Sequence, residues 1–245
     1  MFTVSEREEL RTHLLEFAQA DRRISAAAIT GSATKGTQDE WSDVDLAFGV
    51  APGVSLDEVL GAWTEMMYRD HAAVHHFDIP IGSWVYRVFL LRSTLQVDLA
   101  FVAADQFGAR APSFRLVFGN PVELPARPPP ESTDLVGLGW MYALHVHRCV
   151  ERGRFWQAEL MLSGLRGEVL KLACLRHGLP TSEGRGFDGL PDAVTKPLEA
   201  ALAATLEPDE LRRAFGVAMD GLIAEARLVD AHLAERIEPT LRLLE

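Results

Sequence analysis

The pattern of apolar and polar residues in the first half of the chain predicts helices combined with a small sheet. Helical spacing of apolar residues follows two serine–glutamate pairs, Ser5–Glu8 and Ser55–Glu58, which are typical of capping boxes. The second of these helices is expected to end near Asp70. Short apolar or alternating runs, with a hairpin near the end and an edge strand before it, predict strands. These predicted strands cover residues 24–30, 43–50, 74–79 (the edge strand), 84–91 and 95–102 (the hairpin) and 115–118.

A proline-rich segment divides the chain. Residues 120–130, with the sequence NPVELPARPPP, contain five prolines and cannot form a helix or a central strand. After it the spacing of apolar residues is helical throughout. The expected helices are two long ones within 131–178, broken near Gly153, and two more at about 192–205 and 208–235. The predicted fold class is α+β: a small mixed sheet with flanking helices in residues 1–125, then an all-α helical bundle in residues 131–245.

Composition and charge narrow the classes of function. The chain is 48% hydrophobic and 24% charged, as is usual for globular proteins, and its formal net charge is −11. Since no cluster of lysine and arginine is present, we expect no nucleic-acid partner. No apolar run is long enough to span a bilayer, and the first residues do not resemble a signal peptide, so a cytoplasmic protein without a membrane partner is expected. Cys149 and Cys174 are expected to be buried, reduced thiols.

Three aspartates form the candidate catalytic centre. Asp43 and Asp45 are separated by one residue at the start of a predicted strand, so their side chains should project on one face. Two carboxylates held so close repel each other unless a cation binds between them. Asp98 lies in the apolar strand LQVDLAFV, where a charge is costly without a partner. Oxygen ligands suit Mg²⁺, and three carboxylates could hold two ions roughly 3.5–4 Å apart for an in-line displacement.

A glycine–serine turn is the candidate phosphate-binding element. Gly31 and Ser32 follow a predicted strand. Glycine allows the backbone to approach a phosphate closely, and the backbone N–H groups and the serine hydroxyl can donate hydrogen bonds to it. Thr34 and Lys35 are near enough in sequence to help to hold a triphosphate. Gly31, Ser32 and Lys35 are therefore predicted to bind a nucleoside triphosphate.

The span ITGSATKGTQDEWSDVDLAF, residues 29–48, resembles the nucleotidyltransferase superfamily, which includes antibiotic nucleotidyltransferases. Residues 148–172 are similar to the second-domain helix pair of lincosamide nucleotidyltransferases. The resemblance implies that Gly31 and Ser32 hold the triphosphate and that Asp43 and Asp45 bind magnesium. It also implies that Asp98 completes the metal site or deprotonates the acceptor hydroxyl.

The resemblance leaves the general base open. Kanamycin-type relatives take it from the first helix of the second domain, but the corresponding helix here offers His145 and His147 and no carboxylate before Glu151. Asp98 is therefore the preferred base. Other polar and aromatic residues of the helical half receive a structural interpretation. Glu159 and Glu168 are expected to be solvated, and Trp140, Trp156 and Met161 are expected to belong to the core.

The expected function is Mg²⁺-dependent transfer of a nucleoside monophosphate, AMP being the expected group, from a nucleoside triphosphate to a hydroxyl of a small molecule. Pyrophosphate is the other product. The acceptor is expected to be an antibiotic such as a lincosamide or an aminoglycoside, with the helical domain binding the acceptor or forming a homodimer. Two alternatives stay open. One is nucleotidyl transfer to a protein or RNA partner, as in antitoxin-like pairs, and the other is a catalytically silent relative that acts as a binding module.

Overall fold

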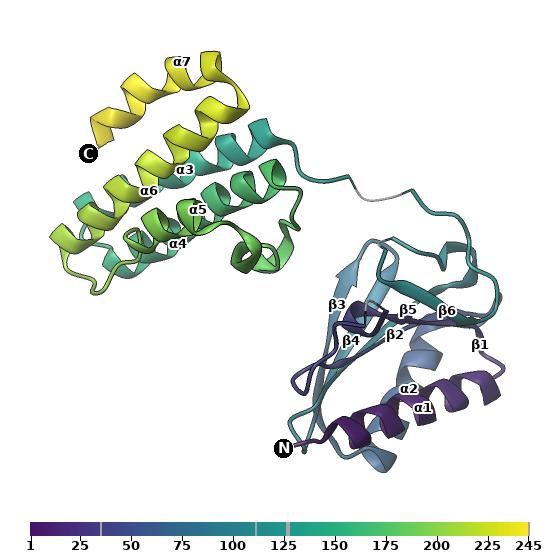
Figure 1. Cartoon of the computed structure of the whole chain (residues 1–245). Helices are drawn as coiled ribbons and strands as arrows, with labels where there is room; N and C mark the ends of the chain where they lie inside the picture. The colour runs from purple at the N-terminus through teal and green to yellow at the C-terminus, as the bar shows by residue number, and fades with distance from the viewer. Residues whose placement is uncertain (35, 111, 126–127, 245) are drawn as a thin grey trace. The chain divides into compact units, whose positions relative to one another are not determined.

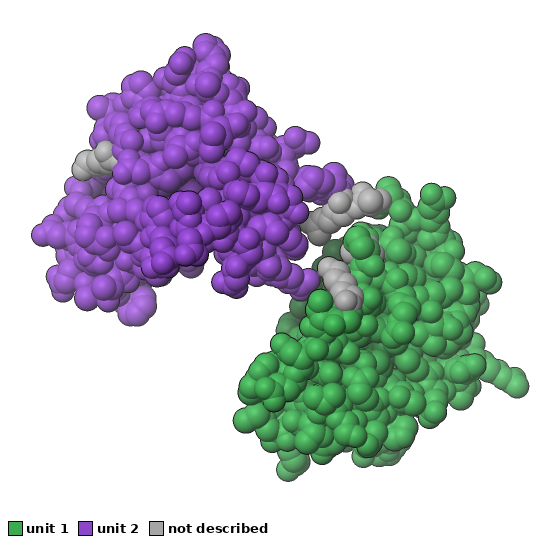
Figure 2. All heavy atoms as spheres, viewed as in Figure 1, with its two compact units in different colours: residues 1–127 green, residues 128–245 purple. Residues whose placement is uncertain are grey.

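The structure, a computed structural model, describes residues 1–34, 36–110, 112–125 and 128–244. The chain divides into two compact units, Met1–Arg127 and Pro128–Glu245 (Figure 2). The first unit combines a sheet with helices and the second is helical, so the predicted fold class is confirmed. Among the described residues, no helix is both long and apolar enough to cross a membrane.

The first unit contains a six-stranded sheet with the strand order β3-β4-β5-β2-β1-β6 (Figure 1). Every strand predicted from the sequence is present, with β3 at an edge and β4 and β5 forming the expected hairpin. Strands β2 and β5 run parallel, and the other described neighbours are antiparallel. The strands are β1 Ile24–Thr30, β2 Val44–Val50, β3 Ala73–Ile81, β4 Trp84–Leu91, β5 Gln96–Ala103 and β6 Phe114–Phe118.

Helices α1 (Val4–Ala20) and α2 (Leu56–Asp70) pack on one face of this sheet (Figure 1). Their fully buried residues, such as Leu14 and Trp63, share one hydrophobic cluster with alternate residues of the central strands. That cluster includes the neighbours of both strand aspartates: Val44, Leu46, Val97 and Leu99. Because successive strand residues point to opposite faces, Asp45 and Asp98 lie on the face away from α1 and α2.

The first turns of α1 and α2 differ from the prediction. The capping box of α1 is formed by Thr3 and Glu6: the Thr3 hydroxyl accepts from the Glu6 backbone N–H at 3.2 Å, and the Glu6 carboxylate accepts from the Thr3 N–H at 2.7 Å. Ser5 already lies inside the helix, where its hydroxyl donates to Glu9. At α2, Ser55 is the N-cap residue, but its side chain makes no capping hydrogen bond. The predicted capping boxes are therefore wrong, although both helices are present.

The second unit is a bundle built on α3, α4 and α6, whose buried residues form one core (Figure 1). The predicted break between the first two long helices is confirmed at Gly153, which has a φ of +67°. Residues 182–189 form two short 3₁₀ turns, at Ser182–Gly184 and Phe187–Gly189. The α-helices are α3 Ser132–Glu151, α4 Phe155–Arg176, α5 Asp192–Glu199, α6 Pro208–Val229 and α7 Ala231–Leu241.

Two predicted helices of this unit have other boundaries. Helix α5 ends at Glu199, earlier than expected. The helix predicted over 208–235 is two helices, since Asp230 adopts an extended conformation with φ −156°. The Asp230 carboxylate then accepts from the Leu233 N–H at 3.0 Å and caps α7. A capping aspartate in the middle of a continuous apolar pattern therefore divides the segment.

Several predicted environments in the helical unit are also wrong. Trp156 is 81% exposed and Trp140 is 40% exposed, so neither is a core residue. Trp140 follows Gly139, which is on the buried face of α3, and Trp156 is in the first turn of α4. Glu168 is buried instead of solvated, and it pairs with Lys171 at 2.8 Å. Met161 does pack against the core, and Cys149 and Cys174 are buried free thiols, as predicted.

Candidate metal and nucleotide site

The structure brings the three predicted aspartates together. Asp43, Asp45 and Asp98 each offer a carboxylate oxygen, and these oxygens all lie within 4.8 Å of one another. Asp45 and Asp98 are direct partners in the parallel β2–β5 ladder, so backbone hydrogen bonds fix their separation. Asp43 comes from the loop residue immediately before β2. All three are partly exposed, so a cation could reach them from solvent.

The electrostatics of Asp98 favour a bound cation. Burial raises the pKa of Asp98, and the negative charge of Asp43 raises it further. The side-chain amide of Gln96 opposes this rise, donating to both Asp98 oxygens at 2.9 and 3.2 Å. A cation between the carboxylates would relieve their repulsion. The oxygen-only ligand set fits a hard divalent ion such as Mg²⁺.

The Gly31–Thr34 turn is packed directly against this cluster. Gly31 has a φ of +65°, and a Cβ atom added there would lie 1.9 Å from Asp45 Oδ2. Only glycine allows the backbone to pass so close to the carboxylate. The Thr34 hydroxyl donates to the Gly31 carbonyl at 2.8 Å and closes the turn. Ser32 follows Gly31 in this turn, while the predicted residue Lys35 lies outside the described residues.

The face of the sheet that carries Asp45 and Asp98 continues away from them as small and apolar residues, some of which are buried in a cluster with Trp84 and Phe107. Ala28, Ala47 and Ala100 are cross-strand partners on β1, β2 and β5. On the hairpin side, Val88 is the β4 partner of Asp98, and Phe77 is in turn the β3 partner of Val88. Phe77 is 52% exposed. A molecule bound at Asp98 would therefore have an apolar surface beside it.

Sequence reasoning missed some polar residues around the cluster. Gln96 is two positions before Asp98 on β5, so strand alternation alone would have placed both on one face. Arg7 and Arg11 are buried on α1, at the helical spacing that continues to Leu14. Arginines at the apolar positions of a helix could have been noticed in the sequence. A guanidinium is seldom buried without a specific partner, so their positions indicate a role.

Among the described residues, the group of possible metal ligands at this site consists of the three aspartates and includes no histidine. The His76 ring lies 3.0 Å from the Tyr68 hydroxyl, and it packs against Phe89. In the second unit, His147 Nδ1 is 2.9 Å from the carbonyl oxygen of Leu244. These contacts give both imidazole rings a structural role, each within its own unit.

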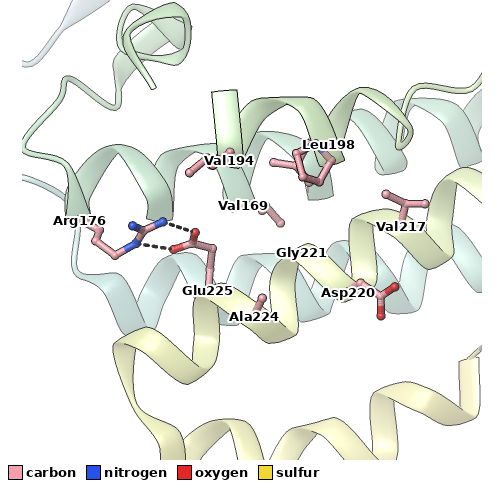
Figure 3. A pocket seen from close by; sticks show the side chains of 11 residues that line it. Val169, Arg176, Val194, Leu198, Val217, Asp220, Gly221, Ala224 and Glu225 are labelled. Carbon is pink, nitrogen blue, oxygen red and sulfur yellow. Dashed lines mark hydrogen bonds and ion pairs between the residues drawn. The ribbon is translucent and has the colours of Figure 1, made fainter. Parts of the chain in front are cut away.

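The helical unit contains a separate pocket of about 420 Å³ between α4, α5 and α6 (Figure 3). Its walls are mainly aliphatic, with contributions from Val169, Val194 and Leu198. At one end, Arg176 forms a two-fold ion pair with Glu225, with N–O distances of 2.7 and 3.2 Å. The pocket therefore offers an apolar surface bordered by a neutralised pair, and it contains none of the residues predicted to act in the site.

Comparisons with known proteins find similar solved structures but no matching family or curated protein. No protein-family model matches the chain, and no curated protein matches it. Among solved structures, the chain is similar to an aminoglycoside 6-adenyltransferase from Bacillus subtilis, with a TM-score of 0.43 and 14% sequence identity. The alignment covers 94% of this chain and 95% of the other. A likeness of this extent leaves the chemistry to be argued from the residues of the chain itself.

Proposed function

We propose that the protein is a Mg²⁺-dependent nucleotidyltransferase, which moves a nucleoside monophosphate, AMP by preference, from a nucleoside triphosphate to a hydroxyl of a small molecule. The observation that carries this proposal is the convergence of Asp43, Asp45 and Asp98, with ligand oxygens within 4.8 Å of one another beside the Gly31 turn. A metal cluster next to a phosphate-binding turn suits phosphoryl-group chemistry.

Each residue has a distinct role in the proposed reaction. The Gly31 turn and the Ser32 hydroxyl donate hydrogen bonds to the triphosphate, and Lys35 adds positive charge. Asp43 and Asp45, with Asp98, hold Mg²⁺, which supplies charge neutralisation at the phosphates when bound. The acceptor oxygen forms a bond to the α-phosphorus while the bond to the pyrophosphate oxygen breaks. Asp98 either completes this metal site or, as the preferred base, takes the proton of the hydroxyl.

The proposed acceptor is a small molecule, such as a lincosamide or an aminoglycoside antibiotic. Exposed Phe77, on the same face of the sheet as Asp98, favours an acceptor with an apolar side, while the net charge of −11 is compatible with a cationic one. The same acidic charge disfavours RNA as the substrate. We propose that the helical unit binds part of the acceptor or forms a homodimer.

Pyrophosphate release from each nucleoside triphosphate, measured with Mg²⁺ and a panel of hydroxyl compounds, tests the proposal. Asp43→Asn or Asp45→Asn should reduce transfer by orders of magnitude, because loss of a metal ligand removes several kcal/mol of transition-state stabilisation. Glu40→Gln is the matched control, since Glu40 is an exposed carboxylate of the same loop. Near-normal turnover of Asp45→Asn would refute the metal site. Labelling of a protein or RNA in place of every small molecule would favour the antitoxin-like alternative.

A further inference from the structure

Helix α1 carries two arginines on its buried face. Arg7 is 2% exposed and Arg11 is 6% exposed. They are four residues apart, on the same side of the helix as Leu14, which packs in the core between the helices and the sheet. A guanidinium is always charged and is costly to bury unless it makes specific polar contacts. The contacts of these two side chains therefore indicate their role.

Arg7 binds the loop that delivers the first aspartate of the site. Its Nη1 atom donates to the carbonyl oxygen of Asp39 at 2.6 Å and to that of Ser42 at 3.1 Å. Its Nε atom donates to Glu8 at 3.2 Å, which balances the charge. Ser42 immediately precedes Asp43. One guanidinium nitrogen thus ties the helix to the backbone on which Asp43 is carried.

Among the described contacts of residues 39–42, the hydrogen bonds other than those from Arg7 stay within this turn. The Ser42 hydroxyl donates to the Asp39 carboxylate at 2.8 Å, and the Trp41 N–H donates to the same carboxylate at 3.0 Å. These bonds lie within residues 39–42, so they fix the shape of the turn but not its position. Trp41 is 70% exposed and does not attach the turn to the core. The contacts from Arg7 join the turn to a helix that is itself packed on the sheet.

Arg11 places a second positive charge near the site. Its Nη1 atom pairs with Glu8, whereas its Nε and Nη2 atoms are buried without a hydrogen-bond partner in the described part of the chain. Burial lowers the pKa of Arg11, and the nearby charges of Glu8 and Asp45 oppose that change. Arg7 therefore contacts the loop before Asp43, whereas Arg11 acts on Asp45 only through its charge.

We infer that Arg7 is a positioning residue of the metal site, which holds Asp43 within ligand distance of Asp45 and Asp98 through the carbonyls of Asp39 and Ser42. The inference rests on the proposed function for the identity of the ligand, a divalent cation. It makes α1 part of the site, although no residue of this helix lies in the carboxylate cluster.

Mn²⁺ titration followed by electron paramagnetic resonance, together with hydrogen exchange of the 40–43 amides, tests this inference on the full chain. Arg7→Met keeps much of the side-chain volume and removes the donors. Its dissociation constant for Mn²⁺ should rise about 10- to 100-fold, as for other residues that orient metal ligands. Exchange at residues 40–43 should accelerate without metal. Arg7→Lys, which can bond one carbonyl, should fall between wild type and Arg7→Met.

Arg87→Met is the matched control in the same unit. Arg87 is also largely buried, donates to the Leu60 carbonyl at 2.9 Å and pairs with Asp78, but it holds a different segment. This variant should lose thermal stability and keep its Mn²⁺ affinity. Tight Mn²⁺ binding and unchanged exchange at 40–43 in folded Arg7→Met would overturn the inference. If Arg7→Met does not fold, wild-type values in Arg7→Lys would overturn it.

The same experiment separates this inference from the proposed function. A wild-type protein that binds no Mn²⁺ would contradict the proposed metal site. Hydrogen exchange in the metal-free protein would then still decide whether Arg7 anchors the loop, since the faster exchange expected of Arg7→Met does not depend on metal.

Discussion

Replacing Asp98 by asparagine removes one of three neighbouring negative charges and keeps the shape of the side chain. With carboxylate oxygens within 4.8 Å of one another, two unit charges repel by about 1 kcal/mol in water and about 3 kcal/mol at an effective dielectric constant near 20. Since the site is partly exposed, we expect a gain of about 1–2 kcal/mol for the metal-free variant. The melting temperature should rise by roughly 4 °C for each kcal/mol in a unit of this size.

The pH dependence follows from the raised pKa of Asp98. Between its ordinary value of 3.8 and the raised value, the folded wild type keeps a proton that the unfolded chain has lost. The stability of the metal-free wild type should therefore fall as the pH rises through this range, and Asp98→Asn should lack this fall. The gain in the free energy of unfolding of Asp98→Asn over wild type should be small near pH 4. It should reach its full value at a pH where Asp98 of the folded wild type is ionised.

Thermal melts in chelator and in Mg²⁺ provide the measurement. Mg²⁺ at about a hundred times its dissociation constant should stabilise wild type by about 2.7 kcal/mol, whereas Asp98→Asn should gain much less and should lose transfer. Asp78→Asn is the control, and it should lower the melting temperature. Arg87 holds the pKa of Asp78 below its ordinary value, so the ionised Asp78 stabilises the folded state. A lower melting temperature for metal-free Asp98→Asn at pH 8 would refute the repulsion argument.

Two further substitutions test the turn beside the cluster. Gly31→Ala should abolish Mn²⁺ binding, because its Cβ would occupy the position of a ligand carboxylate, whereas Gly36→Ala, with the same φ of +65° and open space around it, should cost only about 1–2 kcal/mol of stability. Melting curves and Mn²⁺ titrations of the two variants compare these effects, and equal Mn²⁺ affinities would contradict the packing argument. Ser32→Ala should weaken binding of the Mg²⁺–nucleotide complex by about 1.5–3 kcal/mol, or one to two decades, with a smaller effect on the chemical step. An unchanged nucleotide dissociation constant, measured by calorimetry, would place the triphosphate away from Ser32.

Local sequence patterns were sufficient to predict the strands and the proximity of the three aspartates. Strand alternation identifies the face of Asp45, and an isolated charge in the apolar strand around Asp98 requires a partner wherever the strand lies. The role of Arg7 could not be derived in this way, because its partners are carbonyls of a loop that is distant in sequence. The choice of Thr3 over Ser5 as the N-cap was equally inaccessible, since both residues precede a glutamate at the same spacing.

The parallel pairing of β2 and β5 also has a consequence for folding. A parallel neighbour requires a crossover, and here the chain passes through α2 and the strands β3 and β4 before β5 joins β2. Contacts so distant in sequence form slowly, because the connecting chain must first be ordered. Asp45 and Asp98 therefore meet only when the central sheet has assembled, and a nascent chain that ends before β5 has no metal site. Mg²⁺ should then slow the unfolding of the first unit more than it accelerates folding.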